Sequence, residues 1–409
     1  MTISRWFIGL ASGSGGEAAD AALVETTGIG LQLSARVVHH LRRSHPRDVQ
    51  DLFVKTLSPG GSASFGDLAL LHRQLGECAA ATVLQIVSEA RFDLTRILAV
   101  GHIGPFAWHE PSGRTPASFE IGQSSAIVEK TGITAISEFR ERDVVAGGQG
   151  MPITALADWV FFRSPEQPRL LIHLGGTTSV VFIPANAKPQ EVFAFEAGPG
   201  TRLLDAVMRQ ASGGREHCDA GGKHAVQGRC LDSLVTEWLA HPYFQQRPSK
   251  SLPRSEFGSE WIARAARGVV EAKGTLEDFL CTLSHFLVRG LVRSCQGLPK
   301  TGRSPQVWLS GGGTRNGLFW RLLEQEWPGA ELHRLDEIGV PAQARQAVGA
   351  ALLAALTIDS VPASSPNATG AVGRLLGRIA PGDARNWARC LRWMSEHASP
   401  DISHPNRAA

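Results

Sequence analysis

Alternating apolar and polar runs predict an α/β chain in which strands lead into glycine-rich turns. The first apolar run, residues 6–11, breaks at Ser12-Gly13-Ser14-Gly15-Gly16, and a second apolar run follows at residues 21–25. Residues 30–38 predict a further strand, because their apolar side chains recur at alternate positions. We therefore expect a hairpin, rather than a helix, after this first glycine turn.

The same architecture recurs twice further along the chain. An apolar run at residues 170–174 enters Gly175-Gly176-Thr177 and leaves along a β-branched run, and residues 306–310 enter Gly311-Gly312-Gly313. Turns built of small residues let backbone N–H groups surround an anion, because no side chain stands in the way. Each turn alone is also typical of an ordinary connection, but together they favour a two-lobed phosphotransferase over a single Rossmann unit.

Helical spacing of apolar residues predicts seven helices. One of them is closed by a cap at Gly132, and another opens with a capping box at Thr275 and Asp278. The predicted helices span residues 65–90, 126–132, 154–162, 202–210, 276–293, 341–356 and 382–397.

A dinucleotide-binding fingerprint is an alternative interpretation of the first turn. Gly13, Gly15 and Ala18 fit the pattern GxGxxA. That fingerprint requires a helix directly after the turn and an acidic residue about 20 positions on. Neither is predicted, since a hairpin follows and residues 34–40 contain no acid. A nicotinamide-dependent oxidoreductase is therefore a remote alternative.

Composition narrows the class of protein further. The chain has 409 residues, enough for two domains, and its 43% hydrophobic and 19% charged residues are ordinary for a globular protein. A net charge of +3 argues against a dedicated nucleic-acid-binding protein. The six cysteines form no CxxC pair, which points to reduced residues in a cytoplasmic protein. No segment predicts a signal peptide or a membrane helix, and the polar tail at 399–409 is expected to be mobile.

Several ordered motifs identify a family resemblance over about residues 7–382. The most specific are the run Arg142-Asp143-Val-Val-Ala-Gly147-Gly148-Gln149-Gly150-Met151-Pro152, the turn Gly198-Pro199-Gly200, the run from Gly311 to Asn316, and the segments at 241–244, 248–251 and 256–258. In this order, the motifs resemble those of the anhydro-N-acetylmuramic acid kinases, members of the actin/hexokinase/Hsp70-like ATPase superfamily.

The resemblance implies an α/β fold with two actin-like (ribonuclease H-like) lobes, each a mixed sheet flanked by helices, and a nucleotide cleft between them. Residues 1–150, completed by 366–398, would form the first lobe, and residues 151–365 the second. It also implies ATP and Mg²⁺, with 1,6-anhydro-N-acetylmuramic acid as the acceptor. Water would open the anhydro ring and O6 would take the phosphoryl group, a step in peptidoglycan recycling. A homodimer is a further family expectation.

Site residues follow from the positions that match the family motifs. Glu138 corresponds to the general base, and Arg140, Gln149 and His109 are expected to contact the sugar. Glu17 and Glu196 are expected to contact the metal. The expected nucleotide-binding residues are Ser12, Gly13, Ser14, Gly15, Gly16, Glu17, Asp20, Gly175, Gly176, Thr177, Gly198, Gly200, Gly311, Gly312, Gly313 and Asn316.

The chain also departs from the family pattern. Glu17, Glu138 and Glu196 stand where the family has Asp, so the charge is retained at a longer reach. Other departures replace the polar or charged group itself: Ile103-Gly104-Pro105-Phe106 aligns with His-Gly-Gln-Thr, Gln123 with Asp, His173 with Asn, Gln346 with Glu, and Thr201 with Asn.

These departures leave three interpretations open. The protein is an active kinase for this anhydro-sugar, a kinase for a related one, or an impaired paralogue that binds without turnover. Arg140 likewise has two interpretations. Its guanidinium suits a phosphate or the lactyl carboxylate of the sugar, and it also suits a structural ion pair with Glu141 or Asp143.

Overall fold

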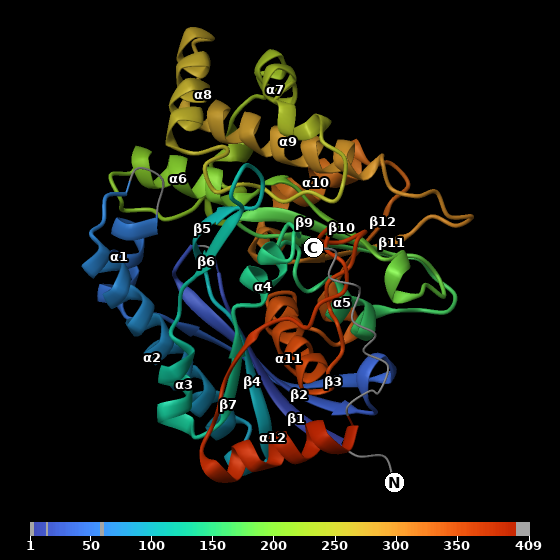
Figure 1. The fold of residues 1–409 in the computed structure, drawn as a ribbon. Coiled ribbons are helices and arrows are strands. Elements are labelled where there is room, and N and C mark those ends of the chain that lie inside the picture. The colour runs from blue at the N-terminus through green and yellow to red at the C-terminus, as the bar shows by residue number, and fades with distance from the viewer. Residues whose placement is uncertain (1–3, 14, 58–60, 398–409) are drawn as a thin grey trace.

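The computed structural model describes residues 4–13, 15–57 and 61–397, and the predicted tail and Ser14 lie outside these ranges. Two mixed sheets lie one above the other, with helices on their outer faces and between them (Figure 1). The predicted two-lobed α/β class is confirmed. The first sheet has the order β13 (Arg378–Ala380), β7 (Thr134–Ser137), β4 (Ile97–Ile103), β1 (Ser4–Ser12), β2 (Ala18–Thr27), β3 (Ser34–Ser44). The second has the order β10 (Phe193–Pro199), β9 (Thr177–Ile183), β8 (Arg169–Leu174), β11 (Gln306–Ser310), β12 (Glu331–Arg334).

Both sheets are built on the same unit. β1 pairs antiparallel with β2 across the first glycine turn and parallel with β4 on its other side. β8 repeats this arrangement, with β9 antiparallel across Gly175-Gly176 and β11 parallel on its other side. The strand that follows Gly16 removes the dinucleotide fingerprint, which needs a helix N-terminus at that point.

The twelve helices of the described residues flank and separate the sheets. In Figure 1, α2 and α3 run along one side of the first sheet, and α6 to α10 lie beyond the second. Their bounds are α1 Arg47–Leu57, α2 Phe65–Glu89, α3 Ser124–Thr131, α4 Phe139–Val145, α5 Ala155–Phe162, α6 Thr201–Ala211, α7 Asp232–Leu239, α8 Ser259–Glu271, α9 Leu276–Cys295, α10 Gly317–Glu326, α11 Arg345–Ile358 and α12 Ala384–His397.

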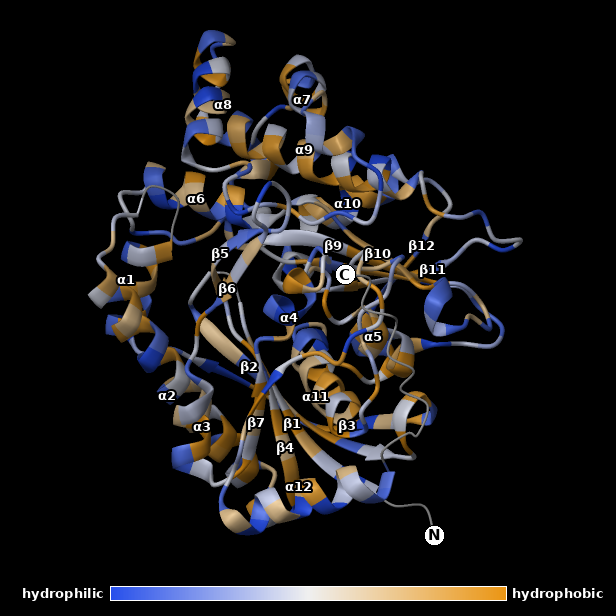
Figure 2. Ribbon diagram, viewed as in Figure 1, coloured by the Kyte–Doolittle hydropathy of each residue, from blue (hydrophilic) through white to orange (hydrophobic). Residues whose placement is uncertain are grey.

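Period-two alternation along β1 buries both faces of the first sheet. Ile8 and Leu10 join the cluster packed under α2, whereas Phe7 and Ala11 join the cluster around α11. α11 approaches β1 so closely that a Cβ at Gly9 would lie 1.7 Å from the Ala347 carbonyl oxygen. Figure 2 shows the apolar colouring of the central strands and of α11 that this two-sided burial requires.

Two predicted boundaries are wrong by a few residues. The strand expected at 30–38 begins only at Ser34, because Gly30 adopts a positive φ of 57° and its N–H donates to Asp359 at 2.7 Å. The helix expected from residue 341 begins at Arg345, after a turn in which the Ala344 N–H bonds the Pro341 carbonyl at 2.7 Å.

Both predicted helix caps are confirmed. Thr275 and Asp278 form the predicted capping box of α9, and Gly132 closes α3 in the left-handed conformation. β13, close to the C-terminus, pairs with β7 in the first sheet, and α11 packs on β1 and β4. No helix in the described part of the chain is both long and apolar enough to cross a membrane.

Candidate functional site

Three glycine turns of the second lobe meet at one edge of its sheet. The Gly200 N–H donates to the Gly176 carbonyl at 3.0 Å, and the Thr201 N–H donates to the Gly175 carbonyl at 2.8 Å. A Cβ at Gly311 would lie 2.6 Å from the Leu174 carbonyl oxygen, which places the third turn against the first. The turns therefore form one continuous backbone surface where β8 and β11 end.

In the first-lobe turn, close packing explains Gly16, whereas Gly13 has free space beside it. Gly16 adopts a φ of 71°, and its Cβ would collide with the Phe53 ring at 2.2 Å. Apart from its chain neighbours, no atom of the described residues lies within 4 Å of a Cβ at Gly13, although the Gly13 carbonyl accepts from the Gly16 N–H at 3.2 Å. Gly13 and Gly15 thus leave exposed backbone to which an anion has access.

The two acidic residues of this turn face different surroundings. Asp20 is buried and binds His40 at 3.1 Å and Arg42 at 2.7 Å, both on β3. Glu17 is exposed, and its carboxylate accepts no hydrogen bond within the described residues. Burial raises the pKa of Asp205 on α6 to about 7; Arg209 opposes this shift and the nearby Glu17 adds to it. Glu17 is thus close enough to α6 of the second lobe for its charge to act on Asp205.

Glu196 is held inside the second lobe. Its two carboxylate oxygens accept from the Thr177 hydroxyl and from the Leu252 N–H, each at 2.6 Å. Burial raises its pKa, and the Leu252 N–H works against that shift. The described residues hold no group of three or more His, Cys, Asp or Glu side chains placed to bind a metal. Of the two predicted metal contacts, only Glu17 has a carboxylate without protein partners.

Glu138 occupies the entrance to α4. It is the N-terminal flanking residue of that helix, with the left-handed angles φ 57° and ψ 38°. A non-glycine residue in this conformation stores strain and is typical of functional sites. Its carboxylate pairs with Arg378 of β13 at 3.2 Å, and the two side chains are 35% and 76% exposed. The predicted base is thus accessible to solvent, with one exposed cation beside it.

Arg140, two residues on, is buried and paired, but not with either partner expected from sequence. One of its terminal nitrogens donates to Glu120 and to the Gly104 carbonyl, both at 2.8 Å. Burial raises the pKa of Glu120 to about 8, against the opposing field of Arg140. Asp143 instead accepts from the Gly150 N–H at 2.9 Å. The buried hydrogen-bond partner of Arg140 is therefore Glu120, rather than Glu141 or Asp143.

His109 and Gln149 connect the lobes through one serine. The ring of His109 bonds Ser118 at 3.1 Å and Ser251 at 3.0 Å, while Ser251 also donates its hydroxyl to the Gln149 carbonyl at 2.9 Å. Burial, followed by the charge of Arg140, lowers the pKa of His109 to about 3, so its ring is neutral. The structure explains both residues as interlobe ties, and their predicted contact with the sugar stays a prediction.

Asn316 follows the third turn and caps α10. Its side-chain oxygen accepts from the Leu318 N–H at 3.0 Å, which is the ordinary role of asparagine at this position. Gly312 lies in the same turn with nothing within 4 Å of a built Cβ. The open backbone at Gly312 is available for binding, and the predicted nucleotide contact of Asn316 stays a prediction.

A pocket is lined by residues from both sheets. Ile103 lies on β4 of the first sheet, and His173 and Ser179 lie on β8 and β9 of the second. Arg140 of α4 and Thr154, just before α5, also line it. Met151, Pro152, Ile153, Arg345 and Gln346 complete its lining. Three sequence departures, at Ile103, His173 and Gln346, thus converge on one pocket.

Sequence analysis missed the charged pair beside this pocket. Arg345 of α11 binds Asp158 of α5 through two hydrogen bonds, of 3.0 and 2.9 Å, and both side chains are buried. The available signal was a single charge within each of two otherwise apolar helices. Such charges are rarely buried unless they are paired.

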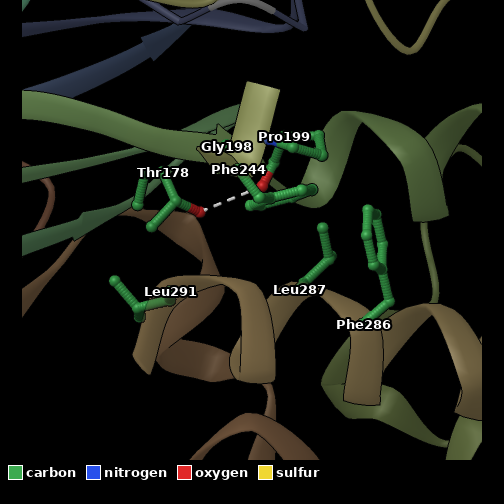
Figure 3. A pocket seen from close by; sticks show the side chains of 8 residues that line it. Thr178, Gly198, Pro199, Phe244, Phe286, Leu287 and Leu291 are labelled. Atoms are coloured by element: carbon green, nitrogen blue, oxygen red, sulfur yellow. Dashed lines mark hydrogen bonds between the residues drawn. The ribbon is translucent and has the colours of Figure 1, made fainter. Parts of the chain in front are cut away.

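A second cavity is apolar and lies behind the Gly198–Gly200 turn (Figure 3). Phe244, Phe286 and Leu287 line it beneath Pro199, whose carbonyl accepts from the Thr178 hydroxyl at 3.3 Å. With few polar groups converging on it, this crevice supports the turn rather than offering a binding site.

Comparisons with known proteins place these features in one family. The family model described as anhydro-N-acetylmuramic acid kinase matches residues 5–382. The kinase of that name from Gloeobacter violaceus is 33% identical over 91% of this chain and 96% of the relative, and that from Bacillus thuringiensis is 30% identical over 90% and 96%. Among solved structures, the activator of 2-hydroxyisocaproyl-CoA dehydratase from Clostridium difficile with bound ADPNP is 14% identical, with a TM-score of 0.41. The match covers 86% of this chain and 94% of that chain. The chain belongs to the anhydro-N-acetylmuramic acid kinase family.

Proposed function

We propose that this protein is an ATP-dependent kinase that opens the ring of 1,6-anhydro-N-acetylmuramic acid with water and phosphorylates O6. The product is N-acetylmuramic acid 6-phosphate, as peptidoglycan recycling requires. The observation that carries the proposal is the family match over residues 5–382, in a chain whose second-lobe glycine turns meet at one edge of their sheet.

The turns account for phosphate binding in this proposal. Backbone N–H groups near Gly13 and Gly15 in the first lobe, and near Gly176 and Gly312 in the second, receive the phosphates. Phosphoryl transfer asks little covalent chemistry of a protein, so positioning and charge stabilisation dominate catalysis.

Mg²⁺ is part of the proposal through Glu17. Nucleotide sites hold Mg²⁺ with one or two carboxylates, phosphate oxygens and water, so one exposed carboxylate beside the turn fits. The ion neutralises the charge that develops on the transferred phosphoryl group. Glu196 fits less well, because Thr177 and Leu252 already occupy its oxygens. It orients the second-lobe turn through Thr177.

Glu138 is the proposed general base. Its position at the start of α4 supports this role, since the carboxylate is accessible and its partner Arg378 is a solvent-exposed cation. An exposed ion pair of this kind contributes about 0–1 kcal/mol of stabilisation. Because this is on the order of thermal energy, the carboxylate readily separates from Arg378. The carboxylate takes a proton from the water that attacks C1, and the C1–O6 bond breaks. The released O6 takes the γ-phosphoryl group of ATP, and ADP leaves.

One observation supports the two alternatives, a kinase for a different anhydro-sugar and an impaired paralogue. The interlobe pocket carries Ile103, His173 and Gln346, all departures from the family pattern. Incubation with ATP, Mg²⁺ and the anhydro-sugar distinguishes them. Formation of a sugar 6-phosphate supports the proposal, and ATP binding without product supports an impaired paralogue. Glu138→Gln should reduce turnover by about 10²- to 10⁴-fold, as expected for loss of a general base.

A cytoplasmic location belongs to the same proposal. All six cysteines are free, including the exposed Cys218, as is usual in a reducing compartment. The partners that we propose are the sugar and ATP, with the homodimer as a family expectation. Sedimentation analysis of the purified chain tests whether it forms this homodimer.

A further inference from the structure

His173 lies between two glycine turns at the end of β8. A Cβ built on Gly175 would lie 2.8 Å from its Nε2 atom, and a Cβ built on Gly311 would lie 3.0 Å from its Cε1 atom. Either substitution would force the imidazole to move. The ring therefore occupies space that both turns leave free, and its orientation is fixed from two sides.

Hydrogen bonding also fixes which ring nitrogen of His173 carries the proton. The Ser310 hydroxyl donates its one hydrogen to the Ile172 carbonyl at 3.1 Å and accepts from Arg345 at 3.4 Å. Its contact with Nδ1 of His173, at 3.2 Å, then requires Nδ1 to be the donor. The neutral tautomer with hydrogen on Nδ1 leaves a lone pair on Nε2.

This lone pair has no protein partner within the described residues, and His173 lines the interlobe pocket. Burial, followed by the charge of Arg345, lowers the pKa of His173 to about 3. Because the ring stays uncharged at neutral pH, Nε2 accepts a hydrogen bond and cannot donate one. A phosphate oxygen offers no hydrogen for such a contact, whereas a hydroxyl group does.

We propose that Nε2 of His173 accepts a hydrogen bond from a hydroxyl group of the acceptor sugar and so helps to select that sugar. This inference rests on the proposed kinase function. The position favours the sugar over the nucleotide ribose, because Arg140, which is expected to contact the sugar, lines the same pocket. Asp158 and Arg345 are positioning residues, since Arg345 reaches the ring only through Ser310.

Paired substitutions of His173 test the proposal. His173→Asn keeps a donor near Ser310 but removes the acceptor at the Nε2 position, whereas His173→Gln places an amide oxygen there. Loss of one hydrogen bond to an uncharged group should weaken sugar binding by roughly 3- to 10-fold. We expect the Asn variant to raise KM for the sugar by that factor, with KM for ATP unchanged, and the Gln variant to restore most of it.

The controls separate this inference from the proposed function. His285→Asn, on α9 outside the pocket, should leave both KM values unchanged. Sugar affinity measured by calorimetry, with a non-hydrolysable ATP analogue present, needs no turnover. A wild-type protein that binds the sugar without product counts against the kinase alone. Turnover with unchanged sugar KM in His173→Asn, or a loss confined to ATP affinity, overturns the inference.

Discussion

The buried pair of Asp158 and Arg345 offers a quantitative test of how α5 and α11 are held together. The pair joins α5 to α11 through two parallel hydrogen bonds, and its side chains are 2% and 3% exposed. Removing one partner leaves the other as an uncompensated buried charge. Removing both charges leaves an apolar contact, which is often close to neutral in stability.

The expected magnitudes follow from what remains around each charge. Breaking a buried ion pair costs about 3–5 kcal/mol. Arg345→Met leaves Asp158 with the Thr154 hydroxyl, which donates at 3.0 Å, so we expect the lower end of that range. Asp158→Leu leaves the guanidinium with one long contact to Ser310 at 3.4 Å, so we expect the upper end. The double variant should cost less than either single variant.

Urea unfolding followed by tryptophan fluorescence measures these free energies. Arg73→Met serves as the matched control, because Arg73 pairs with Glu77 at 3.0 Å on the surface of α2 and both side chains are exposed. Surface pairs contribute about 0–1 kcal/mol. Single variants at the buried pair that cost under about 1 kcal/mol, or a double variant that costs the sum of both, would refute the reasoning.

Three further predictions concern packing, pH and metal. Gly101→Ala should destabilise the fold by about 1–3 kcal/mol or more, because the new Cβ would lie 2.0 Å from the Ala350 carbonyl oxygen. Gly302→Ala is the control in urea unfolding, because a Cβ there meets no described atom within 4 Å beyond its chain neighbours. Burial raises the pKa of Asp205 from 3.8 to about 7 in the folded state. The folded state therefore binds an extra proton, and the free energy of unfolding falls as pH rises between those values. Asp205→Asn should gain stability relative to the wild type across that window, and a difference in thermal stability that stays constant with pH would be contrary evidence. Glu17→Gln should raise the Mg²⁺ concentration needed for half-maximal turnover, and an unchanged Mg²⁺ titration would remove Glu17 from the metal site.

Much of the fold could be predicted because its signals are local. The hairpin after Gly16, the capping box at Thr275 and the helix stop at Gly132 each depend on a few neighbouring residues. The strand start at Ser34 could not be predicted, because Asp359, more than 300 positions away, binds the Gly30 N–H.

The site was predictable as a set of turns but not as a network of side chains. Spacing indicated strand-to-glycine transitions at Gly13, Gly175 and Gly311, and the structure brings the turns at Gly175 and Gly311 together with the Gly198–Gly200 turn. The partner of Arg140 is Glu120, on β6 (Ala117–Glu120), which pairs with β5 (Phe106–Glu110). Arg345 finds Asp158 at a separation of 187 residues. Pairings of this kind depend on how elements pack, which the local pattern of a single sequence does not contain.

The most direct test of the kinase follows the fate of water. The protein is incubated with ATP, Mg²⁺ and 1,6-anhydro-N-acetylmuramic acid in water enriched in ¹⁸O, and the product is analysed by mass spectrometry. We predict one ¹⁸O at C1 and an unlabelled phosphoryl group on O6, with more label than in preformed product exposed to the same water for the same time. ADP release without a phosphorylated sugar, or a phosphorylated sugar whose anhydro ring is intact, would contradict the proposed reaction.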